Sequence, residues 1–392
     1  MRIAIPHEAE RFGANLIHAL QRVYELDAGL SEDVLPGEAL FTVRHVAREV
    51  LYEIQKDMAI IVPVRNERLR LIEGVIVGTP HYCLPIVISA SPKEPIDRFG
   101  MEQKTLERMA TFTKRNILAV HQKDEVFAEA FKEAGYTHIL DDTGNIKSGK
   151  AEGMILGTVL AKLLGKKYIG FIDSDNYFPG AVYEYIQEYA AGFAMSQSPY
   201  SMVRILWQSK PKVRESDLYF AKYGRVSVVT NHMLNRLLSY YTGFETDIIK
   251  TGNAGEHALT TDLAMVLDYA AGYAIEPYHY INLLEKFGGV SSSPHPDVMK
   301  HSVEVFQIES RNPHLHEARG EEHVKDMLEA SMATIYHSSV TPDALREEIL
   351  KELGRKRKEP EPRVYYPALE SMDWKKFEKV LGNRGYEQFL AK

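Results

Sequence analysis

Short apolar runs alternate with amphipathic segments from residue 58 to about residue 180. The apolar runs, expected as strands, lie at 58–64, 85–90, 117–121, 137–140 and 168–172. The amphipathic segments, expected as helices, lie at 69–76, 101–112, 124–134 and 151–164. Strands that alternate with helices of this length predict βαβ units and a mostly parallel central sheet with helices on both faces. The pattern therefore favours the α/β class.

Outside this stretch the alternation is lost. Helices are expected at 181–191, near 232–241, over 300–352 and at 372–390, with extended segments at 194–197 and 202–208. Ahead of it, a strand at 2–5 and helical periodicity over 14–26 are expected. The changes of pattern suggest an N-terminal cap (1–55), a central domain (56–300) and a helical C-terminal region (301–392).

The strand expected at 168–172 runs directly into Asp173, Ser174 and Asp175. Side chains two residues apart on an extended backbone share a face, so these carboxylates can converge on one cation. They would lie at the carboxyl edge of the sheet, where open α/β proteins bind ligands. The pattern is typical of metal-dependent nucleotide-sugar glycosyltransferases, which hold the donor diphosphate there. Taken alone, Asp-x-Asp is more often an acidic turn.

Composition excludes several other classes. The chain has 392 residues, 45% of them hydrophobic, and a net charge of −7, which gives no positive footprint for nucleic acid. A single cysteine, Cys83, leaves no internal disulfide and no cysteine metal site. Charge begins too early for a signal peptide, so a cytoplasmic protein without a membrane partner is expected. Many Glu, Lys and Arg residues beside little Cys are compatible with a thermophile.

The segment from Gly144 to Lys150 fits the phosphate-loop pattern G-x-x-x-x-G-K. The next residue, Ala151, has no hydroxyl group for Mg²⁺, which argues against a nucleoside triphosphatase. Gly149 and Lys150 before a helix still favour a bound phosphate, because an ammonium group at a helix N-terminus attracts anions. The alternative is a solvated loop lysine.

Two more basic segments are candidates for binding anions or nucleotides. Arg65 and Glu67 follow the first strand of the sheet, where a nucleotide base and ribose would lie. Gly224, Arg225 and Ser227 place a guanidinium group between a glycine and a hydroxyl at an expected loop or strand end. Arg offers a planar fork for carboxylate or phosphate, and local N–H groups complete an anion pocket. Taken alone, either segment reads as ordinary surface charge.

Acidic and imidazole side chains later in the chain supply further candidates. Thr260 and Asp262 follow a glycine-containing loop at 251–258, and Asp262 could simply occupy the first turn of a helix. His314 and His316 lie one residue apart. One imidazole nitrogen added to Asp175 would complete a mixed O/N cation site, which is more typical of Mn²⁺, Co²⁺ or Zn²⁺ than of Mg²⁺. Paired histidines are more often surface or structural residues.

Together these motifs resemble the mannosyl-3-phosphoglycerate synthases, and the likeness runs from the segment PHEAERFGAN at 6–15 to the His-x-His segment. The related glucosyl-3-phosphoglycerate synthases share the Gly-Lys, Asp-Ser-Asp and Gly-Arg-Val features, typically with Thr where this chain has Ser227. The resemblance implies a GT-A type α/β fold with a helical C-terminal extension. It also implies transfer of mannose from GDP-mannose to 3-phosphoglycerate with retention, as in mannosylglycerate biosynthesis, and a homodimer is expected.

The resemblance also assigns roles to residues. It implies a donor half that ends near residue 180, an acceptor half after it, and a metal histidine in the C-terminal region. The implied donor-site residues are Pro63, Arg65, Glu67, Lys150, Asp173 and Ser174. The implied acceptor-site residues are Gly224, Arg225, Ser227 and Thr260. Asp173, Asp262 and Arg225 are implied as catalytic, and Asp175 with His314 or His316 as ligands of a divalent cation (Mg²⁺, Mn²⁺, Co²⁺ or Zn²⁺).

Three other functions share parts of this pattern. A glucosyl-3-phosphoglycerate synthase differs in its sugar and base, which the residues do not specify. A nucleotide-sugar pyrophosphorylase usually carries a glycine-rich signature near its N-terminus, and none is found near residues 1–60. A nucleotide-sugar-binding module without turnover would not need both a metal set and an acceptor arginine. Retention could use same-face attack or a covalent carboxylate intermediate; no nucleophile is apparent, which favours same-face attack.

Overall fold

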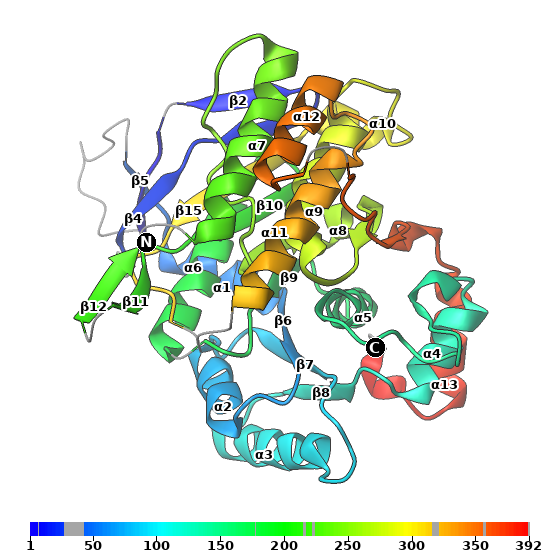
Figure 1. Ribbon diagram of the computed structural model, residues 1–392. Coiled ribbons are helices and arrows are strands. Elements are labelled where there is room, and N and C mark those ends of the chain that lie inside the picture. Colours follow the sequence, from blue (N-terminus) through cyan, green and yellow to red (C-terminus); the bar gives the residue numbers. More distant parts are fainter. Residues whose placement is uncertain are drawn as a thin grey trace.

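The computed structural model of the chain describes residues 1–6, 8–26, 43–176, 178–214, 217–221, 224–315, 321–355 and 358–390. A single large sheet passes through the molecule (Figure 1). One half consists of four parallel strands, which are β6 (Met58–Val64), β7 (Leu84–Ser89), β8 (Leu118–His121) and β9 (Tyr168–Phe171). The carboxyl ends of these strands therefore meet at one edge of the sheet.

The other half of the sheet mixes strand directions. Its strands are β13 (His257–Thr260), β10 (Tyr200–Leu206), β15 (Val303–Glu309), β1 (Arg2–Ala4), β2 (Ala9–Phe12), β3 (Asn15–His18), β4 (Gln21–Glu25) and β5 (Val43–His45). The order is β5-β1-β4-β15-β10-β13-β9-β6-β7-β8, with β3 on β15 and β2 on β3. β13 runs antiparallel to both of its neighbours, whereas β10 and β15 are parallel to each other.

Helices cover both faces of the sheet. One face carries α1 (Arg48–Lys56), α2 (Leu69–Gly78), α3 (Arg98–Thr113) and α6 (Pro179–Met195). The opposite face carries α4 (Glu125–Glu133), α5 (Lys150–Leu163), α7 (Arg225–Thr242), α8 (Thr261–Val266), α9 (Ile275–Phe287), α10 (Pro296–His301), α11 (Glu321–Tyr336), α12 (Asp343–Glu352) and α13 (Trp374–Asn383). Helix α11 packs against α7 and α9 (Figure 1).

Strand β6 shows why the sheet needs both layers. Successive side chains on a strand point to opposite faces. Ile61 accordingly belongs to the core beneath α5, and Ile60 and Val62 belong to the core beneath α2 and α6. All three are fully buried. A strand that is apolar at every position needs cover on both sides, as in parallel sheets generally.

Smaller elements complete the described chain. Two small antiparallel pairs are β11 (Lys210–Arg214) with β12 (Asp217–Ala221), and β14 (Tyr269–Ala270) with β16 (Tyr365–Tyr366). Single 3₁₀ turns are η2 (Thr137–Ile139), η3 (Gly272–Ala274), η4 (Leu369–Ser371) and η5 (Glu387–Phe389). Within the described residues, no helix combines the length and apolar character needed to cross a membrane.

The predicted α/β class, the parallel strands expected at 58–64, 85–90, 117–121 and 168–172, and the terminal helix are confirmed. Four local predictions are wrong. The segment 14–26 forms β3 and β4, 137–140 is mostly the 3₁₀ turn η2, 194–197 begins as the end of α6, and 300–352 includes the central strand β15. Residues from all three predicted regions join one sheet, and the boundaries at 55 and 300 stay predictions.

Candidate functional site

The loop after β9 carries the Asp-x-Asp pair at the carboxyl edge of the parallel strands. Asp173 is partly exposed, whereas Asp175 is buried at 7% exposure. The side chain of Asn176 fixes the loop, because its Nδ2 donates to the carbonyl oxygen of Asp173 at 2.9 Å and to Oε1 of Glu256 at 3.0 Å. The predicted pair therefore lies on a loop that is hydrogen-bonded to Glu256, the residue just before the neighbouring strand β13.

Lys150 is the first residue of α5, and its side chain reaches this loop. Its Nζ lies 2.6 Å from Oδ1 of Asp173 and 2.8 Å from Oε1 of Glu276 on α9. Burial acts to lower the pKa of Lys150, but the negative charges of Asp173 and Glu276 outweigh it and raise the pKa above its ordinary value. Lys150 is thus held as a cation beside the Asp-x-Asp loop, as a group facing a diphosphate must be.

Gly255 brings the 251–255 loop against the same carboxylate. A Cβ atom at Gly255 would lie 2.8 Å from Oδ2 of Asp173 and 3.6 Å from Nζ of Lys150. Real Cβ atoms do not approach another atom so closely, so a larger residue here would displace the ion pair. The glycine-containing loop noted in the sequence therefore packs directly on Asp173.

Glu256 is a site residue that the sequence reasoning missed. It is fully buried, and its carboxylate accepts hydrogen bonds from Nδ2 of Asn176 at 3.0 Å and Nε1 of Trp207 at 2.9 Å. Burial and the charges of Asp173 and Asp175 raise the pKa of Glu256 to about 7, although Asn176 and Lys150 act to lower it. The sequence signal that could have identified Glu256 is its position as an acidic residue between the glycine-containing loop and an apolar strand.

His314 lies on the turn that follows β15. Its ring stacks on Trp207 with centroids 4.0 Å apart, and its Nδ1 lies 4.0 Å from Oε1 of Glu256. The backbone N–H of His314 donates to the carbonyl oxygen of Ser209 at 3.0 Å. The other candidate imidazole, His316, falls outside the described residues.

Asp175 and His314 are therefore gathered around one buried carboxylate, Glu256. In the part of the chain that the structure describes, no three His, Cys, Asp or Glu side chains are arranged to hold a metal ion by themselves. The donor chemistry nevertheless fits a divalent cation, because several carboxylates lie close together in a buried place. Such a cation would bind through one or two protein ligands and complete its shell with substrate phosphates and water.

The predicted nucleotide residues lie at the end of β6, which is paired with β9. Pro63 is within the strand, Arg65 is exposed and Glu67 is partly exposed. Asn66 between them has a left-handed φ of 60°, and its N–H donates to Oγ of Ser91 at 2.7 Å. Because β6 and β9 are parallel neighbours, this loop lies beside the Asp173 loop.

That nucleotide loop is anchored from β7 and α3. Oγ of Ser91 donates to Oε1 of Glu102 at 2.6 Å, and Nη2 of Arg98 donates to the carbonyl oxygen of Glu67 at 2.8 Å. Glu102 is buried and also accepts from Oγ of Ser89 at 2.6 Å. Ser174, the remaining donor candidate, is buried within the Asp-x-Asp loop.

The predicted acceptor segment begins helix α7 rather than ending a strand. Gly224 is the N-cap residue, Arg225 is the exposed first residue, and Ser227 lies partly exposed in the first turn. Further along α7, Oδ1 of Asn231 accepts the N–H of Gly252 at 2.7 Å. The helix is thereby attached to the loop that packs on Asp173.

Thr260 and Asp262 are not brought to this edge. Antiparallel pairing places His257 opposite Phe171 and Thr260 opposite Tyr168, so Thr260 lies at the far end of β9 from Asp173. Oγ1 of Thr260 caps α8, and Asp262 is exposed in the first turn of that helix. The helix-start interpretation of this pair is confirmed. The acidic side chain that this segment brings to Asp173 is Glu256.

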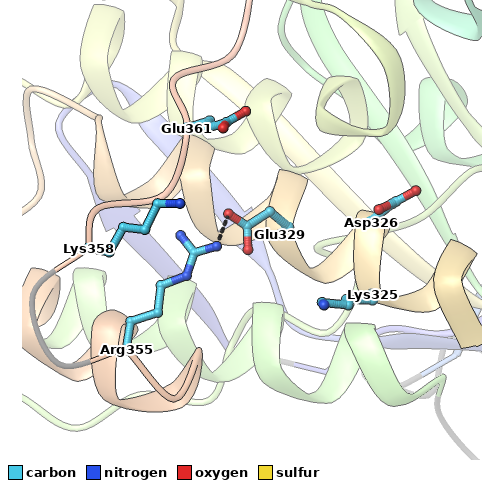
Figure 2. Close-up of a pocket in the computed structure, with 6 residues that line it drawn as sticks. All are labelled: Lys325, Asp326, Glu329, Arg355, Lys358 and Glu361. Carbon is cyan, nitrogen blue, oxygen red and sulfur yellow. Dashed lines mark ion pairs between the residues drawn. The ribbon is translucent and has the colours of Figure 1, made fainter.

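A separate cavity of about 220 Å³ lies between α11 and the segment after α12 (Figure 2). Its lining is charged with both signs and comprises Lys325, Asp326, Glu329, Arg355, Lys358 and Glu361. Arg355 and Glu329 form an ion pair across it at 2.8 Å. None of the residues predicted for the donor, acceptor or metal site lines this cavity.

Comparison with known proteins agrees with the motifs. The family model of mannosyl-3-phosphoglycerate synthase matches residues 5–381. The mannosyl-3-phosphoglycerate synthase of Pyrococcus furiosus is 47% identical over 354 residues, covering 90% of this chain and 89% of the relative. That of Aeropyrum pernix is 38% identical over 372 residues and covers 94% of each.

A weaker structural likeness was also found. It is to a glucosyl-3-phosphoglycerate synthase from Mycobacterium tuberculosis in complex with phosphoglyceric acid, with 15% identity, a TM-score of 0.49, and coverage of 83% of this chain and 96% of that chain. The near full-length sequence matches decide the assignment. The chain belongs to the mannosyl-3-phosphoglycerate synthase family of glycosyltransferases.

Proposed function

We propose that this chain transfers mannose from GDP-mannose to 3-phosphoglycerate with retention, giving mannosyl-3-phosphoglycerate and GDP. The observation that carries the proposal is the position of Lys150, paired with Asp173 and Glu276 at the carboxyl edge of the parallel strands. A partly buried cation beside an Asp-x-Asp loop suits a nucleotide diphosphate. The nucleotide loop at Arg65–Glu67 lies on the neighbouring strand, where the base and ribose of the donor would bind.

Asp175 and His314 are proposed to hold a divalent cation together with the donor diphosphate. When bound, that cation stabilises the negative charge that develops on the leaving GDP. The mixed oxygen and nitrogen donor set favours Mn²⁺, Co²⁺ or Zn²⁺ over Mg²⁺. Lys150 supplies a second positive charge, and its two ion pairs keep the ammonium group in place.

The start of α7 is the proposed acceptor site. Helix N-termini attract anions because their first N–H groups point outward and the helix dipole is positive there. Arg225 adds a guanidinium fork and Ser227 a hydroxyl at that same turn. A molecule with one phosphate and one carboxylate, such as 3-phosphoglycerate, matches this combination of donors.

Same-face attack is the proposed route to retention. A covalent route would need a carboxylate oxygen directed at the sugar. Glu256 accepts from Asn176 with one oxygen and from Trp207 with the other, while Asp173 pairs with Lys150. Both carboxylates are thus engaged in holding the site together, which favours attack by the acceptor hydroxyl on the face that GDP leaves.

The direct test is an assay of the purified chain with 3-phosphoglycerate and a panel of sugar nucleotides in the presence of Mn²⁺. Formation of mannosyl-3-phosphoglycerate and GDP is expected, with GDP-mannose as the best donor. Preference for a glucose nucleotide would indicate a glucosyl-3-phosphoglycerate synthase, and pyrophosphate release a pyrophosphorylase. A complete lack of product in single-turnover reactions would indicate a nucleotide-sugar-binding module without catalytic activity. The expected homodimer stays a prediction, testable by light scattering.

A further inference from the structure

Helix α6 begins shortly after one proposed cation ligand and contacts the turn that carries the other. It begins at Pro179, shortly after Asp175, and its buried residue Glu184 faces the turn that carries His314. Glu184 was not among the residues indicated by the sequence, and it belongs to no motif. It lies in a long helix with many buried positions, where a fully buried carboxylate requires a specific reason.

The carboxylate of Glu184 is saturated by groups of that turn. Its Oε1 accepts the backbone N–H of Arg311 at 2.6 Å. Its Oε2 accepts the backbone N–H of Asn312 at 2.9 Å and the side-chain Nδ2 of Asn312 at 2.6 Å. Three donors from two adjacent residues converge on one side chain, and only an acceptor with two oxygens can satisfy them all.

The remainder of the turn is held by neighbouring backbone. The N–H of Ser310 donates to the carbonyl oxygen of Leu206 at 2.9 Å, and the N–H of His314 donates to Ser209 at 3.0 Å. Between Ser310 and His314, the backbone N–H groups of Arg311 and Asn312 donate to Glu184, a side chain from outside the turn. The side chain of His314 projects from this turn and stacks on Trp207.

A second buried acid lies one helical turn further along α6. Burial and the neighbouring charge of Glu184 raise the pKa of Glu188 well above its ordinary value. The neutral form of Glu188 is thereby favoured, and the three hydrogen bonds that reach the turn from these two acids are those of Glu184.

We propose that Glu184 is a positioning residue that fixes His314 relative to Asp175, so that helix α6 sets the spacing of the two cation ligands. The inference rests on the proposed function, because it assumes a cation at Asp175 and His314. Asp175 lies shortly before the helix, and Glu184 within the helix binds the turn that carries His314. Groups that orient metal ligands commonly affect metal affinity about 10- to 100-fold when they are changed.

The test compares Glu184→Gln with Glu188→Gln in the full-length chain. Glutamine keeps the size of Glu184 but turns an NH₂ group toward N–H donors, so at least one of the three hydrogen bonds is lost. At position 188 the same substitution is made one helical turn away, at a side chain that makes none of these three hydrogen bonds, so that variant is a matched control on the same helix. Thermal unfolding of both variants reports any general effect on stability.

The first measurement is Mn²⁺ binding by calorimetry in the presence of GDP. Glu184→Gln should weaken Mn²⁺ binding about tenfold or more, and Glu188→Gln should leave it within about twofold. At saturating Mn²⁺, kcat of Glu184→Gln should recover toward that of the unchanged chain. Equal Mn²⁺ affinity in the two variants would overturn the inference.

A second measurement needs no metal. The chain has two tryptophans, and in a Trp374→Phe background the emission reports Trp207, on which His314 stacks. Glu184→Gln should change that emission as the turn shifts, whereas Glu188→Gln should not. Unchanged emission in both would contradict a positioning role.

The outcomes also separate this inference from the proposed function. If the unchanged chain neither binds Mn²⁺ with GDP nor forms product, the proposed function fails. If it does both, and Asp175→Ala abolishes Mn²⁺ binding while Glu184→Gln matches Glu188→Gln, the inference alone fails.

Discussion

At the donor edge Lys150 is held between two carboxylates, whereas on the acceptor side Arg225 is exposed at the first turn of α7. The donor edge is also backed by fully buried strands and by Gly255, which leaves no space beside Asp173. The acceptor side consists of a helix start and a few polar groups at the surface.

This difference indicates how each substrate would be bound. Ion pairs that exist before any ligand arrives keep charges in place, so little reorganisation is needed when a diphosphate binds. An arginine at the exposed start of a helix binds an anion mainly through the geometry of its fork. We therefore expect large effects from changes at the donor edge and smaller, substrate-specific effects on the acceptor side.

The largest effect is expected for Asp175→Ala. Removal of this buried carboxylate takes away the bridge between protein, cation and diphosphate, and kcat should fall on the order of 10²-fold or more. Steady-state kinetics at fixed Mn²⁺ measures this fall in kcat. Asp175→Asn keeps the shape of the side chain and so separates the loss of ligand charge from the loss of packing. Near-normal kcat in both variants would rule out this cation site.

Lys150→Ala should weaken donor binding and leave the acceptor KM nearly unchanged. A charge-assisted hydrogen bond is worth about 1.5–3 kcal/mol, so the KM for GDP-mannose should rise about tenfold to a hundredfold. Lys147→Ala is the matched control, since Lys147 lies nearby but bonds the carbonyl oxygen of His138. A rise in the acceptor KM instead would assign Lys150 to the other pocket.

Arg225→Lys tests the acceptor side. Lysine keeps the positive charge but loses the bidentate fork, so the KM for 3-phosphoglycerate should rise roughly tenfold with little change for GDP-mannose. Arg236→Lys on the same helix is the control, because Arg236 pairs with Glu348 on α12. If both variants behave alike, Arg225 is an ordinary surface residue.

The last effect is on stability rather than on activity and concerns the core beneath the donor edge. His279 is buried on α9, the helix that also carries Glu276, and burial with the nearby charge of Arg204 lowers the pKa of His279 to about 3. The unfolded chain takes up this proton near pH 6.5, so folding stability should decrease as the pH falls from 6.5 toward 3. The steepest contribution is about 1.4 kcal/mol per pH unit.

Urea unfolding at pH 7, 6 and 5 measures this decrease. A His279→Phe variant should show a shallower loss of stability over that range, because the ring no longer titrates. His257, also buried and with its pKa lowered by burial, supplies a parallel contribution that remains in the variant. Identical pH slopes in the two proteins would contradict the role given to His279.

Much of the fold was predictable because its signals are local. The apolar run expected at 58–64 is strand β6 itself, and the helix expected at 151–164 begins one residue earlier as α5. The segment 14–26 failed because its extended form depends on partners far away in sequence: β3 and β4 both pair with β15. Such pairing overrides local helical periodicity.

The site residues also divide into those with a local sequence signal and those that depend on long-range contacts. Asp173 and Lys150 were found because each directly borders an apolar strand or helix of the alternating pattern. Glu256, Glu276 and Glu184 were missed because their importance comes from long-range contacts with Asn176, Lys150 and Asn312. An acidic residue in a helix or before a strand has no periodic signal that distinguishes a buried acceptor from a solvated surface charge.

Strand β15 has a consequence for the synthesis of the chain. It inserts between β10 on one side and β3 and β4 on the other, so it joins the N-terminal strands to the remainder of the sheet. A ribosome must therefore translate past Glu309 before the first strands can reach their final partner. The earliest part of the polypeptide completes the sheet last, and nascent chains that stop short of that point carry an exposed N-terminal edge.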